Sequence, residues 1–115
     1  ALRCGSGLVS IATHPFHAAA LTAQRPELMC HPVNTRSDLD GLLQRATVVV
    51  LGPGLSQDTW AEALWDSVLR DPKYSELPLL LDADALNLLA ERPQKRDSWV
   101  LTPHPGEAAR LLGES

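Results

Sequence analysis

Short apolar runs alternate with amphipathic stretches along this chain. The runs are rich in Val, Ile and Leu and have the length of strands, whereas the stretches repeat apolar residues at the spacing of a helix. We expect strands at residues 8–13, 28–33, 46–51, 78–82 and 98–102. The helices expected between and after them cover about residues 15–21, 38–43, 57–70, 85–90 and 105–112.

Prolines, caps and apolar stripes refine several of these elements. Pro32 places the second strand at a sheet edge or close to its own end, because proline cannot donate to a ladder. Ser37 is expected to cap the second helix. In the long third helix, Trp60, Leu64 and Val68 recur at every fourth position, which predicts one buried stripe.

The order of the elements predicts an α/β fold with a mainly parallel sheet and flanking helices. Strand–helix–strand units with short connections favour parallel strands and right-handed crossovers. Residues 46–51 are apolar throughout, which is typical of a parallel strand covered on both faces. The chain has 115 residues, enough for one domain, and both of its ends resemble interrupted helices. We therefore expect residues 1–115 to be the central part of one longer domain, truncated at both ends.

Composition and charge argue against several classes of function. Ten basic residues are scattered through a chain of net charge -4, so a nucleic-acid groove or an anionic membrane surface is not expected. No apolar run of about 18 residues and no signal pattern occurs, which favours a soluble, cytoplasmic protein. Cys4 and Cys30 lack partners at metal-ligand spacing and are expected to be reduced, partly buried thiols.

Candidate chemistry lies in three loops, each directly after a predicted strand, where ligands bind in open α/β sheets. The first loop is Gly52-Pro53-Gly54. Its two glycines allow the backbone to approach a ligand closely, and the free N–H groups of the following helix favour an anion such as phosphate. A tight structural turn is the alternative interpretation.

The second loop holds Asp82 and Asp84, with Asn87 one helical turn further on. Two carboxylates at this spacing can face the same crevice or hold Mg²⁺ through water. In the structural alternative, Asp82 accepts hydrogen bonds from loop N–H groups and Asp84 caps the next helix. Both interpretations stay open at this point.

The third loop presents His104 between two prolines. Pro103 and Pro105 restrict the backbone on both sides, so the imidazole has little conformational freedom. Pro105 suits the first helical position and Glu107 the first turn. We therefore expect His104 to bind a ligand or to transfer a proton. The remaining histidines, expected at the surface or behind a site, are His14, His17 and His31.

Four motifs together resemble those of ADP-dependent NAD(P)H-hydrate dehydratases, the carbohydrate-kinase-like domain of the nicotinamide repair system. They occupy residues 5–9, 50–55, 81–87 and 101–112. The Asp-Ala-Asp-Ala-Leu-Asn and Thr-Pro-His-Pro-Gly-Glu sequences are specific in combination, and the resemblance covers nearly the whole chain.

This resemblance implies a ribokinase-like fold and a nucleotide-binding lyase of metabolite repair. The enzyme would restore NADH or NADPH from its hydrated form, with ADP (ATP in eukaryotic relatives) and Mg²⁺. A phosphoryl group would pass to the added hydroxyl and then leave. The resemblance assigns substrate binding to Gly54 and His104. Shaping of the site or contact with Mg²⁺ would fall to Asp82, Asp84, Asn87 and Glu107.

Family members carry further segments on either side of the region that this chain resembles. A Gly-Gly-Ala loop precedes it, and a Lys-Gly strand and a Gly-Asp-Val-Leu helix start follow it, supplying the nucleotide cradle and the catalytic Asp. We therefore expect the catalytic residue to lie C-terminal to Ser115 and the chain alone to be inactive. The intact protein is expected to form a homo-oligomer and to be a candidate for fusion to an NAD(P)H-hydrate epimerase domain.

Two other functions stay open. One is a ribokinase-like kinase of a small vitamin precursor, although the paired aspartates and the proline-flanked histidine argue against it. The other is a non-catalytic dinucleotide-binding module.

Overall fold

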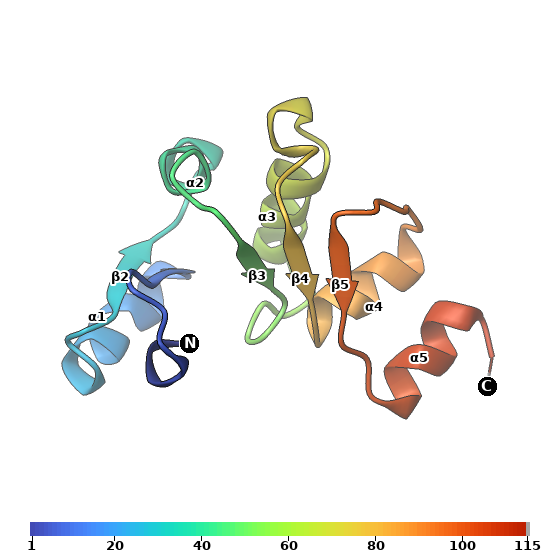
Figure 1. The fold of residues 1–115 in the computed structure, drawn as a ribbon, viewed down its shortest axis with the longest axis horizontal. Helices are drawn as coiled ribbons and strands as arrows, with labels where there is room; N and C mark the ends of the chain where they lie inside the picture. The colour runs from blue at the N-terminus through green and yellow to red at the C-terminus, as the bar shows by residue number, and fades with distance from the viewer. Residues whose placement is uncertain (115) are drawn as a thin grey trace. The chain divides into compact units, whose positions relative to one another are not determined.

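The computed structural model describes residues 1–114, which form strands, α-helices and two short 3-10 helices (Figure 1). They divide into two compact units, the first ending at Arg45 and the second beginning at Ala46. In chain order the elements are η1 (Leu2–Cys4), β1 (Ser10–Thr13), α1 (Pro15–Gln24), β2 (Met29–Pro32), α2 (Arg36–Leu43), β3 (Val49–Leu51), α3 (Thr59–Leu69), η2 (Pro72–Tyr74), β4 (Leu79–Leu81), α4 (Asp84–Glu91), β5 (Trp99–Leu101) and α5 (Pro105–Leu112).

The first unit pairs β1 with β2 in parallel, with Ser10 opposite Met29 and Thr13 opposite Pro32. Pro32 is the last residue of β2, as its missing N–H predicts. Helix α1 contacts β2, and its N-cap is His14, whose Nδ1 accepts the N–H of Phe16 at 3.2 Å.

Helix α2 begins differently from the sequence prediction. Its N-cap is Thr35, not Ser37, which lies inside the first turn. The Asp38 carboxylate accepts the N–H of Thr35 at 3.1 Å, and the Thr35 hydroxyl accepts the N–H of Asp38 at 3.4 Å. This reciprocal capping box satisfies two N–H groups of the helix end at once, so it outcompetes a single serine cap.

The second unit is a three-stranded sheet in the order β3-β4-β5, with every pair parallel and Leu51, Leu81 and Leu101 in one row. Figure 1 shows α3 and α4 on the same side of this sheet. The parallel pairing of the strands within each unit confirms the α/β prediction.

The core of the second unit is aliphatic around one tryptophan. Trp65 and Leu81 are fully buried, and the predicted stripe of α3 is confirmed, since Leu64 and Val68 are buried and Trp60 is half-buried. Burial of such side chains stabilises the fold by roughly 1.5–3 kcal/mol each. The loops that follow the strands of the second unit therefore start from elements that are anchored in a buried core.

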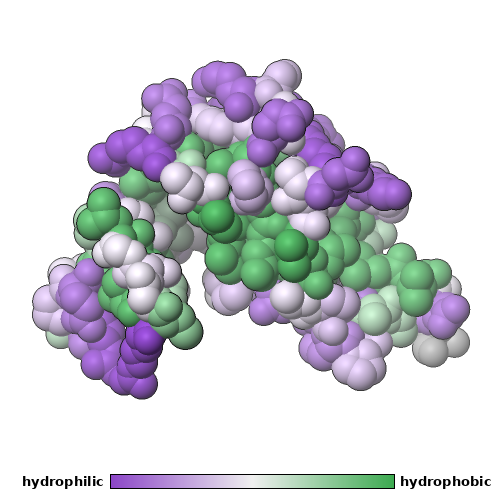
Figure 2. Space-filling model, viewed as in Figure 1, coloured by the Kyte–Doolittle hydropathy of each residue, from purple (hydrophilic) through white to green (hydrophobic). Residues whose placement is uncertain are grey.

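The other face of this sheet is apolar and exposed. Val50, Leu80 and Val100 share one row of the register, and Val50 and Val100 are 61% and 58% exposed. Figure 2 shows hydrophobic side chains gathered over these strands. The expectation that residues 46–51 are covered on both faces is therefore wrong for the described part of the chain, because Val50 in the middle of β3 is exposed.

Two expectations about environment can be compared with the structure. Among the described residues no helix is both long enough and apolar enough to cross a membrane. Neither cysteine forms a disulfide; Cys30 is half-buried as expected, whereas Cys4 is exposed.

Candidate functional site

The three loops singled out by the sequence meet at one edge of the second sheet. Since β3, β4 and β5 are parallel and end in register at Leu51, Leu81 and Leu101, the loops after them start side by side. The Thr102 N–H donates to the Leu81 carbonyl at 3.2 Å and the Asp82 N–H to the Leu51 carbonyl at 3.1 Å, which extends the alignment beyond the strands.

Gly52 and Gly54 have different tasks in the first loop. A Cβ on Gly52 would lie 1.7 Å from the carbonyl oxygen of Asp82, and Gly52 has φ +135°, so only glycine fits this contact between loops. Gly54 has φ +72° and is exposed, and a Cβ there would meet nothing within 4 Å. Gly52 therefore joins two loops, and Gly54 leaves its backbone open to a ligand.

The second loop turns through a strained residue. Ala83 has φ 49° and ψ -125°, a region that glycine normally occupies, and the Ala85 N–H donates to the Asp82 carbonyl at 3.1 Å across it. Such a backbone costs on the order of 1–3 kcal/mol and persists only where neighbours impose it. Gly52, which lies against the carbonyl of Asp82, is one such neighbour.

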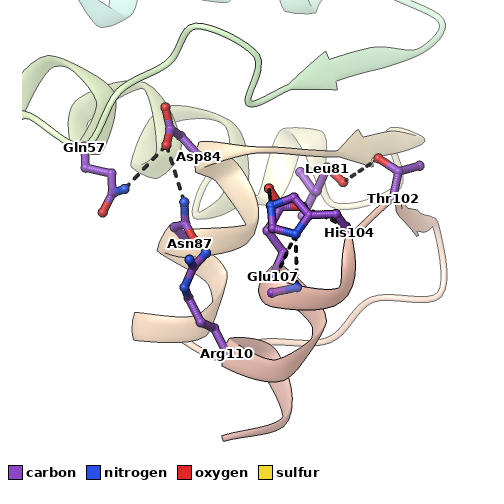
Figure 3. A network of polar contacts seen from close by, with 9 residues as sticks. Gln57, Leu81, Asp84, Asn87, Thr102, His104, Glu107 and Arg110 are labelled. Carbon is purple, nitrogen blue, oxygen red and sulfur yellow. Dashed lines mark hydrogen bonds and ion pairs between the residues drawn. The ribbon is translucent and has the colours of Figure 1, made fainter. Parts of the chain in front are cut away.

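Asp84 is the first residue of α4 and not its cap, which is Ala83. Its carboxylate instead accepts the N–H of Ser56 at 2.9 Å. It also accepts the side-chain amides of Gln57 and Asn87, both at 3.4 Å (Figure 3). The capping alternative for Asp84 is therefore wrong. Asp84 fastens the loop after β3 to the start of α4.

The Asp82 carboxylate behaves differently. Asp82 is half-buried, and within residues 1–114 its side chain makes no hydrogen bond or ion pair, so it does not accept loop N–H groups as its structural alternative predicts. The described residues also contain no group of three His, Cys, Asp or Glu that could hold a metal ion. Asp84 is therefore engaged by three donors, whereas the Asp82 carboxylate is not engaged by any described residue.

His104 caps α5 with its own side chain. Its Nδ1 accepts the N–H groups of Gly106 at 3.0 Å and Glu107 at 3.3 Å, while the Glu107 carboxylate accepts the His104 N–H at 3.0 Å. Glu107 Oε1 also lies 3.2 Å from Nε2. A Cβ on Gly106 would lie 3.0 Å from the ring, so glycine leaves room for it.

This capping box decides which atoms of His104 are available. Since Nδ1 accepts two N–H groups, the neutral ring carries its proton on Nε2, beside Glu107. The His104 side chain is nevertheless 61% exposed, whereas that of Glu107 is 9% exposed. The ring is thus presented to solvent in one orientation, with Glu107 as its buried support.

Arg110 is the residue that the sequence interpretation missed. Its Nη1 donates to Oδ1 of Asn87 at 2.9 Å, so the amide of Asn87 faces Arg110 on one side and Asp84 on the other. A shallow cleft of about 330 Å³ lies here, lined by Gln57, Asn87, Glu91 and Arg110. The sequence could have pointed to Arg110 through its position, since it lies three residues after Glu107, nearly one helical turn along α5.

The site residues predicted from sequence thus form two clusters. Asp84 and Asn87 are joined to the Gly54 loop through Ser56, and His104 is joined to Glu107. The backbone of Asp82 contacts the end of β3 at Leu51 and the neighbouring loop at Gly52. All of these residues belong to the second unit.

Comparison with known proteins gives the family. A family model described as NAD(P)H-hydrate dehydratase matches residues 1–115. The bifunctional NAD(P)H-hydrate repair enzyme of Coxiella burnetii is 56% identical over 115 residues, covering 100% of this chain and 23% of that protein. The ADP-dependent (S)-NAD(P)H-hydrate dehydratase of Lactiplantibacillus plantarum is 40% identical over 111 residues, 95% of this chain and 40% of that protein. This chain therefore spans less than half the length of these relatives.

Solved structures give the same fold. A hypothetical protein from Streptococcus mutans matches with a TM-score of 0.86 and 36% identity, over 97% of this chain and 41% of that one. A ribokinase-like superfamily protein from Enterococcus faecalis matches with a TM-score of 0.79 and 26% identity, over 96% and 39%. The fold is that of a ribokinase-like protein, and the chain belongs to the NAD(P)H-hydrate dehydratase family.

Proposed function

We propose that this chain supplies the substrate-side loops of an ADP-dependent NAD(P)H-hydrate dehydratase. A phosphoryl group would pass from ADP to the hydroxyl added to the nicotinamide ring. Phosphate and a proton from the neighbouring carbon would then leave, and the ring double bond of NADH or NADPH would return. The main support is the alignment of three candidate loops at one sheet edge, in a chain that the family model matches throughout.

Gly54 and His104 are the proposed substrate contacts. Gly54 is exposed and has no side chain, so backbone groups of its loop can reach the hydrated dinucleotide. The exposed ring of His104 is held in one orientation by Glu107, and both of its nitrogens already face groups of its own helix. We infer that His104 orients the substrate and does not transfer the proton.

The other predicted residues would shape this site. Asp84 and Asn87 fix the loop after β3, and Glu107 fixes His104. The Asp82 carboxylate is the one in this set that has no partner in the described structure, so it is the group most available to a ligand.

The remaining machinery is proposed to lie outside residues 1–115. The relatives compared above are longer, and the names of two of them state ADP dependence or bifunctional repair. We propose that a catalytic Asp, the nucleotide cradle and any fused epimerase domain belong to further parts of a cytoplasmic, homo-oligomeric protein. Mg²⁺ is proposed to enter with the nucleotide, because proteins usually bind this ion through one or two carboxylates together with substrate phosphates.

A repair assay tests this proposal. The chain and a longer protein that contains it are given hydrated NADH, ADP and Mg²⁺, and the return of reduced-nicotinamide absorbance is followed. We expect turnover by the longer protein only. Phosphorylation of a vitamin precursor by the longer protein, without repair, would instead support a kinase, and dinucleotide binding without either reaction would support a binding module.

A matched pair of variants tests His104 within that assay. His104→Asn keeps an oxygen that can cap α5 but removes the imidazole, and His14→Asn makes the same change at the cap of α1. We expect His104→Asn to weaken binding of hydrated NADH about tenfold, the loss of roughly one good contact. His14→Asn should leave it unchanged. Equal binding by both variants would sink the assignment of His104.

A further inference from the structure

Four groups form a chain of hydrogen bonds from α5 to the loop after β3. Arg110 donates to Asn87 at 2.9 Å, Asn87 donates to Asp84 at 3.4 Å, and Asp84 accepts the Ser56 N–H at 2.9 Å. Figure 3 shows Arg110, Asn87 and Asp84 following one another from α5 to α4. The Arg110 relay, as we name these four residues, ends two positions after Gly54.

The order of charges in the Arg110 relay is favourable. The carbonyl of the Asn87 amide faces the guanidinium of Arg110, and its NH₂ group faces the carboxylate of Asp84. Arg110 and Asp84 therefore polarise the Asn87 amide in the same direction, and this strengthens both hydrogen bonds that the amide makes. The contacts at the two ends are short and involve charged groups, whereas the middle contact is long and depends on how Asn87 is held.

Ser56 is held in a conformation that it would not adopt alone. Its φ is 68°, in the left-handed region that residues with a Cβ rarely occupy, at a cost of about 1–2 kcal/mol. A strained residue of this kind persists where its surroundings fix it. The bond from its N–H to Asp84 is the contact that crosses from another element to do so.

We propose that Arg110 and Asn87 are positioning residues that hold the Gly54 loop in its substrate-binding geometry through Asp84 and Ser56. The role rests on the proposed function, in which Gly54 contacts the hydrated dinucleotide. In this role Arg110 and Asn87 act on the loop and need no contact with the substrate. Arg110 lies on the helix that His104 caps, so the Arg110 relay also couples the two candidate substrate loops.

Two variants and their combination test the relay in the longer protein. Arg110→Met and Asn87→Leu each remove one link but keep the length or bulk of the side chain. Exchange of the Ser56 amide hydrogen reports on the loop, and the dissociation constant for hydrated NADH reports on the site. Arg70→Met is the matched control, because Arg70 makes an ion pair with Asp66 on the surface of α3.

We expect each single variant to speed Ser56 exchange and to weaken binding about fivefold, the effect of one lost hydrogen bond. The effect should appear in KM with kcat kept, since substrate and transition state lose the same support. The double variant should be little worse than either single one, because both remove the same connection. Arg110→Lys should restore part of the affinity, and Arg70→Met should change neither measurement.

Three results would overturn the inference. Unchanged Ser56 exchange in Arg110→Met and Asn87→Leu would show that the relay does not hold the loop, even if Gly54→Ala still weakens binding. Additive effects in the double variant would show two independent roles. The third result is faster Ser56 exchange in Arg110→Met and Asn87→Leu, with an unchanged affinity for hydrated NADH in these variants and in Gly54→Ala. It would show that the loop does not bind this substrate. The proposed function of Gly54 would then fail together with the positioning role.

Discussion

The backbone of Ala83 places an alanine where glycine is the usual residue. We expect Ala83→Gly to raise the free energy of unfolding by about 1 kcal/mol, because relief of strain exceeds the extra freedom that glycine gives the unfolded chain. Chemical denaturation measures the change. Ala63→Gly, at an exposed position in the interior of α3, is the control and should lower stability by about 1 kcal/mol. Loss of stability in both variants would contradict the strain at Ala83.

Gly52 and Gly54 offer a second comparison at the same scale. Gly52→Ala should cost about 3 kcal/mol or more, because the new Cβ would overlap the Asp82 carbonyl and the two loops would have to separate. Gly54→Ala has open space and should cost only on the order of 1–2 kcal/mol for its left-handed backbone. Denaturant midpoints with constant slopes check the difference. Similar costs for both variants would mean that the loops do not touch in solution.

The site residues show how far sequence reasoning reaches at this scale. Gly54, Asp84, Asn87, His104 and Glu107 could be selected because turn chemistry and local spacing mark them. Their partners could not, since the contact of Asp84 with Ser56 joins residues 28 positions apart. The same limit hid Arg110, whose partner Asn87 lies on another helix.

Among the elements, the start of α2 depends on one exposed carboxylate. The N–H groups of Asn34 and then Thr35 lower the pKa of Asp38 from 3.8 by hydrogen bonding to its charged form. Because the pKa of Asp38 is lower in the folded state than in the unfolded state, the charged carboxylate stabilises the fold above pH 3.8. This stabilisation is lost as pH falls through the lowered pKa.

We therefore expect acid to loosen α2 through Asp38. Asp38→Asn should remove the part of the pH dependence that begins below pH 3.8, seen as the difference between the stability profiles of the two proteins. Glu27→Gln, in an exposed turn, should keep the original profile. Identical profiles for the Asp38 variant and the unchanged protein would rule out this linkage.

Element types were predictable, but some of their ends and surroundings were not. The α3 stripe and Pro105 at the start of α5 followed directly from helical spacing and from the fixed φ of proline. The cap of α2 was misplaced because Ser37 and Thr35 are both good caps, and only the reciprocal bond with Asp38 decides between them. The exposure of Val50 was missed because an apolar run does not reveal what packs on it.

For the whole molecule, the exposed apolar sheet face has a measurable effect. Val50 and Val100 lie in one register row and are more than half exposed, so this chain should bind a hydrophobic dye such as ANS. Val50→Thr with Val100→Thr keeps the β-branched shape and should reduce dye fluorescence several-fold. Thr47→Ser, an exposed change just before β3, should leave it unchanged. Undiminished fluorescence in the double variant would place the dye elsewhere.

The positive φ angles of Ser56 and Ala83 also have a consequence for protein engineering. These two positions are locally frustrated, because the residue type and the backbone conformation favour different structures. A screen for thermal tolerance should therefore return glycine at Ala83 early. Such hits would relax the loops beside Gly54, so we expect them to raise thermal tolerance and to lower the repair activity that we propose for the longer protein.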